Sequence, residues 1–160
     1  MADGELEYER LKNKAHEEYS KIGKVFCPNL KTEVAFNSNG FWHILYRGRG
    51  KKRDSGAQVM RFKLLSKAVS LVSETATLQE YDSFTGEVPT KDHKTRILKL
   101  TKVEYYGYIG IFDGWKIKVI IKRLGNGQPF FWSVIPNWVT NRKRDSRFSY
   151  RNSAGNLEED

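Results

Sequence analysis

The first half of the chain spaces its apolar residues mainly with the period of a helix. Residues 5–22 carry apolar side chains three and four positions apart, which predicts an amphipathic helix that Gly23 ends. Residues 56–73 show the same spacing, which predicts a second long helix with Ser55 as its N-cap. Between them, the apolar run Phe41–Tyr46 predicts a short helical turn.

The apolar period changes to two near Thr75, and this spacing is typical of strands. Strands are predicted over 24–26, 32–36, 78–81, 95–112 in one or two pieces, 115–123 and 129–135, with a loop over 83–92 that contains Gly86 and Pro89. Helices followed by an antiparallel meander indicate an α+β fold. The sequence therefore predicts N-terminal helices packed on a curved, C-terminal antiparallel β-sheet.

The length of 160 residues suits a single domain. We divide it into an N-terminal helix (1–23), a core (24–140) and a tail (141–160) that is first basic and then acidic. Cys27 is the only cysteine, which argues against a disulfide framework and a cysteine zinc site. Because Met1–Arg10 is acidic and polar and no apolar run is long enough to cross a bilayer, we expect a cytoplasmic protein with no membrane partner.

The charge is concentrated in the middle of the chain. The whole sequence carries a formal charge of +9, but residues 21–150 hold 24 basic and 10 acidic residues, a net of +14. Such a field attracts polyanions. We therefore expect RNA or another single-stranded nucleic acid to bind, with an affinity that falls steeply as salt rises.

The basic residues gather in three places: the loop 47–53, the strand 115–123 and the segment 142–144. The first two each have an ordinary alternative. The loop Arg47–Arg53 (RGRGKKR) either grips phosphates or is a solvated linker, and the lysine face of strand 115–123 either follows a phosphate backbone or is a solvated face. Aromatic side chains beside them could stack on bases. The candidate nucleic-acid-binding residues are Arg47, Arg49, Lys51, Lys52, Arg53, Lys116, Lys122, Trp132, Arg142, Lys143 and Arg144.

Two polar residues stand among apolar neighbours. His43 lies between Trp42 and Ile44, where it is either a general base for a ribose hydroxyl or a core histidine. In the last strand, strict alternation places Phe131, Ser133 and Ile135 on one face. Ser133 is then either a substrate-facing hydroxyl or a buried one bonded to backbone. The three histidines show no metal-ligand spacing.

Several segments together resemble the phage-borne branch of the barnase–EndoU–colicin–RelE (BECR) superfamily of ribonucleases. The segments are GFWHILY, AQVMRFKLLSKAVSLV, VEYYGYIGIFDGWKIKVIIKR and GNGQPFFWSVIP, and they cover residues 34–140. The resemblance implies helices followed by a curved antiparallel sheet whose concave face holds the site. It also implies that His43, Arg61, Lys118 and Ser133 are the catalytic residues. The chain departs from EndoU-like members because no second histidine lies in a matching late strand.

The implied activity is that of a metal-independent endoribonuclease without a cofactor. The ribose 2′-hydroxyl attacks the phosphorus, His43 takes or relays the proton, and Arg61 with Lys118 stabilises the transition state. Members of the superfamily often act as toxins on tRNA or mRNA, which implies an acidic immunity or antitoxin partner. Two alternatives stay open. One is a non-catalytic RNA-binding module of a phage or mobile element, and the other is a protein whose basic surface binds an acidic protein.

Overall fold

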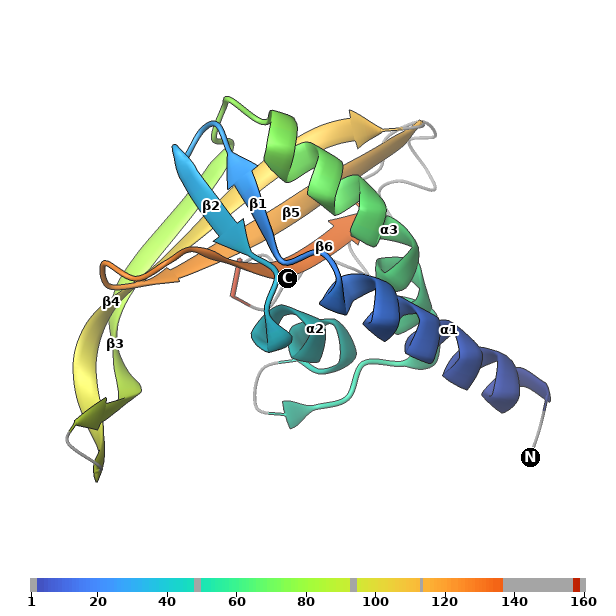
Figure 1. The fold of residues 1–160 in the computed structure, drawn as a ribbon, viewed down its shortest axis with the longest axis horizontal. Coiled ribbons are helices and arrows are strands. Elements are labelled where there is room, and N and C mark those ends of the chain that lie inside the picture. The colour runs from blue at the N-terminus through green and yellow to red at the C-terminus, as the bar shows by residue number, and fades with distance from the viewer. Residues whose placement is uncertain (1–2, 48–49, 93–94, 113, 137–156, 159–160) are drawn as a thin grey trace.

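The computed structural model describes residues 3–47, 50–92, 95–112, 114–136 and 157–158. The predicted tail 141–160 therefore lies outside the described residues except for Leu157 and Glu158. In chain order the elements are α1 (Asp3–Ser20), β1 (Lys24–Cys27), β2 (Thr32–Ala35), α2 (Ser38–Leu45), α3 (Ser55–Glu74), β3 (Glu80–Asp92), β4 (Thr95–Phe112), β5 (Trp115–Leu124) and β6 (Phe130–Pro136) (Figure 1). The predicted α+β class is confirmed.

The strands form one sheet in the order β1-β2-β6-β5-β4-β3. Neighbours pair antiparallel, as predicted, except that β2 joins β6 in parallel through Ala35 and Phe130. The sheet is therefore mixed, because the early hairpin β1–β2 joins the meander at β6. Since the β2–β6 pairing is limited to this one position, the remaining edge of β6 faces α2 and α3.

The predicted helices form, with small differences at their ends. The expected N-cap of α3 was wrong: the cap is Asp54, whose carboxylate accepts a hydrogen bond from Ala57 N at 2.8 Å. Asp54 caps better because its charge also interacts favourably with the helix N-terminus. The predicted helical turn is a two-turn helix, α2, capped by Asn37. None of the helices that the structure describes has the length and apolar character of a transmembrane segment.

The predicted loop over 83–92 is wrong, because these residues belong to β3. They pair residue by residue with the first half of β4, from Asp92 opposite Thr95 to Ser83 opposite Glu104. Gly86 and Pro89 are tolerated because β3 is an edge strand, where one side of the backbone has no ladder to complete. Local composition indicated a loop, and the long partner strand overrides it.

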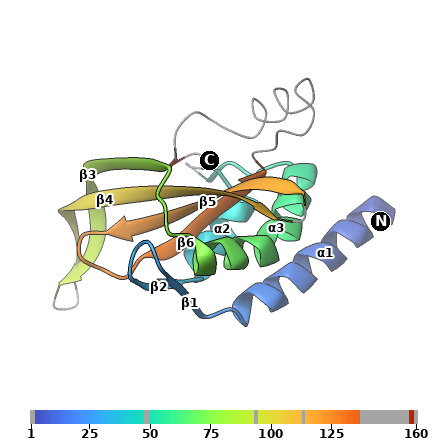
Figure 2. The same cartoon turned by 90° about the horizontal axis from the view of Figure 1, so that it is seen from above.

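The sheet has a helical face and an opposite face. On the helical face, α3 packs with Ala68, Leu71 and Val72 in one core with Ile117 and Val119. On the opposite face a smaller cluster contains Val103, Tyr105, Ile120 and Leu157. Figure 2 shows α1 and most of α3 below the strands β3, β4 and β5 in that view.

The β3–β4 hairpin reaches well beyond the helices (Figure 1). Its outer part carries apolar side chains in water, including Leu98 at 64% and Leu100 at 69% exposed. The functional candidates that the structure describes lie instead on the central strands β5 and β6, on α2 and α3, and in the loop between these helices.

Candidate functional site

The basic loop after α2 folds back on itself and brings Arg53 beside His43. Tyr46 and Lys52 form an isolated antiparallel bridge, and Arg53 N donates to Leu45 O at 2.9 Å. The Arg53 guanidinium then donates from Nε to the His43 carbonyl at 3.0 Å, and its Nη2 lies 3.1 Å from His43 Nε2. Arg53 is therefore buried, at 6% exposure, and does not lie at the surface, where the sequence placed it.

His43 is fully buried, with 0% exposure. Because a guanidinium can only donate, its contact with Nε2 makes Nε2 the acceptor and assigns the ring hydrogen to Nδ1. Nδ1 has no hydrogen-bond partner among the described residues. Burial, followed by the charges of Arg53, Arg61 and Lys122, lowers the pKa of His43 from 6.5 to about 2. The imidazole is therefore neutral in this arrangement.

Protonation of His43 should couple acidification to unfolding. The unfolded chain binds a proton near pH 6.5 whereas the folded chain does not, so stability is lost as pH falls below the unfolded pKa. Between pH 7 and pH 4.5 this loss should be about 2–3 kcal/mol. Urea unfolding of His43→Gln across this range should show a correspondingly smaller acid loss. The exposed His16→Gln is the control, and an equal acid loss in all three proteins would contradict the expectation.

Arg61 and Ser133 meet across the open edge of β6. Arg61 Nη1 donates to Ser133 Oγ at 2.6 Å and to the Val134 carbonyl at 3.2 Å. Both side chains are buried, with Arg61 at 2% and Ser133 at 0% exposure. The structure thus brings together two of the residues that the resemblance singled out, and Ser133 is bonded to a cation as well as buried.

A β-bulge in β6 changes the faces predicted by strict alternation. Ile120 lies opposite Ser133, but Ile121 lies opposite Phe131, so Trp132 is an extra residue on β6. Phe131 consequently packs in the core on the helical side, not on the face of Ser133. The predicted common face of Phe131 and Ser133 is therefore wrong.

Trp132 connects the histidine to a lysine. Its ring stacks on His43 with centroids 4.2 Å apart and planes 24° apart, and Lys122 Nζ lies 4.1 Å from its centroid. Lys122 also lies 5.3 Å from the ring of Tyr105. Burial lowers the pKa of Lys122. An indole that already contacts an imidazole and an ammonium offers little ring surface to a base, which disfavours the predicted stacking role of Trp132.

These contacts define one unit, here named the His43 cluster. Its members are His43, Arg53, Arg61, Lys122, Trp132 and Ser133. The sequence interpretation assigned Arg53 and Lys122 to a nucleic-acid-binding surface. It missed Tyr105, whose ring contacts Lys122. The alternation of Val103 and Tyr105 on one face of β4 was the signal that could have identified Tyr105 as buried. The described ranges contain no group of three histidine, cysteine, aspartate or glutamate side chains suited to a metal ion.

Lys118 differs from the expected arrangement. It is buried, and its Nζ lies 3.3 Å from a carboxylate oxygen of Glu80 on β3. The charge of Lys118, which lies on β5, is therefore held toward β3, beyond β4. Ser133 lies on β6, on the opposite side of β5. Lys122, four residues further along β5, is the strand lysine that acts on His43.

The remaining basic candidates fall into two groups. Arg47, Lys51 and Lys52 are exposed, and Lys116 is half-buried. The other predicted binding residues, Arg49, Arg142, Lys143 and Arg144, lie outside the described residues. The described part of the loop thus keeps three cations at the surface.

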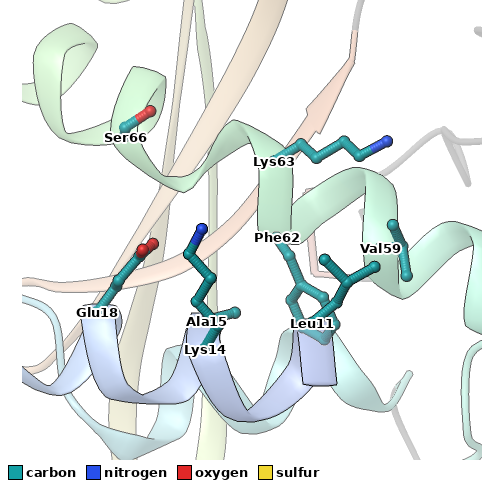
Figure 3. A pocket seen from close by; sticks show the side chains of 8 residues that line it. All are labelled: Leu11, Lys14, Ala15, Glu18, Val59, Phe62, Lys63 and Ser66. Carbon is teal, nitrogen blue, oxygen red and sulfur yellow. The ribbon is translucent and has the colours of Figure 1, made fainter. Parts of the chain in front are cut away.

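A separate hollow lies between α1 and α3 (Figure 3). Leu11, Ala15 and Phe62 line it, with Lys14 and Lys63 among its polar residues. It contains no member of the His43 cluster.

Comparisons with protein-family models, curated proteins and solved structures found no match, so the interpretation of the site depends on its own geometry.

Proposed function

We propose that this protein is a metal-independent endoribonuclease whose site is the His43 cluster. The observation that carries the proposal is a connected set of contacts: Arg53 contacts His43 Nε2, Trp132 links the imidazole to Lys122, and Arg61, whose charge also acts on the imidazole, holds the Ser133 hydroxyl. Positive groups held in place at a poorly solvated site are what a phosphorane-like transition state requires. The net charge of +14 over residues 21–150 and the resemblance to BECR ribonucleases support the same proposal.

In the proposed reaction, RNA first changes the partner of Arg53. A phosphodiester that pairs with this guanidinium would draw it from His43 Nε2, and its negative charge would raise the pKa of the imidazole. Nε2 then takes the proton of the 2′-hydroxyl as the 2′-oxygen bonds to phosphorus. The bond to the 5′-oxygen breaks, and this oxygen receives the proton back. The products are a 2′,3′-cyclic phosphate and a 5′-hydroxyl.

Arg61 and Lys122 stabilise the charge that develops on the non-bridging oxygens. Ser133, positioned by its 2.6 Å hydrogen bond from Arg61, orients the phosphate. Lys118, paired with Glu80, has no place in this step and is assigned to the stability of the sheet.

The test is incubation of the purified protein with total tRNA and rRNA in EDTA, followed by analysis of the fragment ends. We expect cyclic phosphates and 5′-hydroxyls, and no cleavage of 2′-O-methyl RNA, which lacks the nucleophile. His43→Gln should keep RNA affinity and lose about 10²–10⁴-fold in cleavage. Undiminished cleavage by that variant, or cutting of the 2′-O-methyl strand, would contradict the proposal.

The second candidate is a non-catalytic RNA-binding module. It is favoured by the complete burial of His43 and by the engagement of its Nε2 with Arg53. Both candidates require binding that weakens as salt rises. Salt-sensitive binding without cleavage, unchanged in His43→Gln, would support the module.

The proposal extends to partners and compartment. RNA is the proposed substrate, and the protein would act in the cytoplasm. An acidic immunity or antitoxin protein stays a prediction, and the exposed cations Arg47, Lys51 and Lys52 are the surface it would meet.

A further inference from the structure

Leu157 inserts into the face of the sheet opposite α3. It is 4% exposed and packs in one cluster with Val103, Tyr105 and Ile120. The fit is close: a side-chain carbon at Gly107 would lie 3.2 Å from Leu157 Cδ2. The burial of a leucine side chain is worth a substantial share of a small domain's stability. The contact therefore fixes this part of the chain on the sheet.

Glu158 binds directly to the His43 cluster. Its backbone carbonyl accepts a hydrogen bond from Trp132 Nε1 at 3.0 Å. Its carboxylate acts on Lys122: the charge of Glu158 opposes the lowering of the lysine pKa by burial. The segment therefore brings negative charge to the half-buried side of the cluster, where Trp132 and Lys122 lie.

We propose that the 157–158 segment is an autoinhibitory contact: it occupies the RNA-binding side of the His43 cluster and RNA must displace it. This inference rests on the proposed function. A phosphodiester that reaches Lys122 takes the place of the Glu158 charge, because both are anions that act on the same ammonium. The buried leucine then provides the free energy that keeps the site closed, and the acidic residue provides selectivity for displacement by a polyanion.

The closed state should lower the apparent affinity for RNA by the fraction of molecules that are open. In the full chain, Leu157→Ser removes the apolar anchor and retains Glu158. We expect its apparent Kd for a fluorescent single-stranded RNA to be about tenfold tighter than that of the unchanged protein. The matched control is Leu6→Ser, at a leucine of α1 that is 55% exposed, and it should leave the Kd unchanged.

A second measurement reports docking without RNA. The indole N–H of Trp132, assigned by its loss in Trp132→Phe, should shift in the amide–indole NMR spectrum of Leu157→Ser and exchange faster with D₂O. A shifted indole together with tighter RNA binding supports the proposal. An unshifted indole overturns it, because the segment then does not contact Trp132 in solution.

The two proposals fail in different ways. If the unchanged protein binds RNA and Leu157→Ser binds it equally well, autoinhibition is overturned while the proposed function stands. If neither protein binds RNA even at low salt, the proposed function is overturned, and the inference that rests on it falls as well.

Discussion

Arg61→Gln should lower RNA cleavage by about 10²–10³-fold while leaving RNA affinity within a fewfold of the unchanged protein. Arg61 contributes a charge at the proposed transition state and holds Ser133 Oγ at 2.6 Å. Both contributions are greatest in the transition state, where charge develops on the non-bridging oxygens, so kcat should fall far more than KM rises. Single-turnover cleavage of a defined RNA measures the two separately.

The control is Lys63→Gln, which removes one positive charge from the exposed side of the same helix. It should weaken binding slightly and leave the chemical step unchanged. Because Arg61 is 2% exposed, thermal melting must first show that Arg61→Gln remains folded. Equal cleavage losses in the two variants would mean that net charge, and not the position of Arg61, carries the effect.

Gly40→Ala should lower the free energy of unfolding by about 2–3 kcal/mol. A methyl group at Gly40 would lie 2.5 Å from the Phe131 carbonyl oxygen and 2.6 Å from Tyr19 Oη. Neither neighbour can move easily, because Phe131 is part of β6 and Tyr19 donates to the Asn37 carbonyl at 2.6 Å. The substitution therefore pushes α2, and His43 with it, away from β6. Urea unfolding measures the loss.

Gly4→Ala is the matched control for this prediction. A methyl group there meets nothing within 4 Å, and Gly4 lies in the first turn of α1. Alanine should change stability by about 0.5 kcal/mol or less, in the stabilising direction. A Gly40→Ala protein as stable as this control would show that α2 adapts to the extra carbon.

Local signals were sufficient for most of the fold. Helix α3 and strand β5 were predicted from apolar spacing alone, because α3 buries one continuous face and apolar residues alternate at Ile117, Val119 and Ile121 of β5. Only the start of β3 was predicted, by the strand over 78–81; residues 83–92 were missed because they have little strand character and are held by their pairing with β4. No local pattern can report such a partner. The parallel contact between Ala35 and Phe130 was missed for the same reason.

In the candidate site, too, some features follow from the local sequence and others depend on distant partners. His43 and Ser133 stood out as polar residues in apolar runs, and both are buried at the cluster. The hydrogen bonds of Arg53 to His43 depend on how the loop after α2 folds back, which composition does not specify. Likewise, the bulge at Trp132 results from the fit of β6 to β5 and turns the indole toward His43. Single residues could thus be predicted, but their contacts could not.

The single parallel contact between β2 and β6 also has a consequence for synthesis of the protein. β2 is made early, yet its partner in the sheet, Phe130, follows it by most of the chain. On the ribosome, the surfaces of β2 and α2 that contact β6 therefore stay uncovered until β6 emerges. Contacts so distant in sequence close slowly. The sheet therefore cannot close until β6 has been made, although α1 and the β1–β2 hairpin are synthesised long before it.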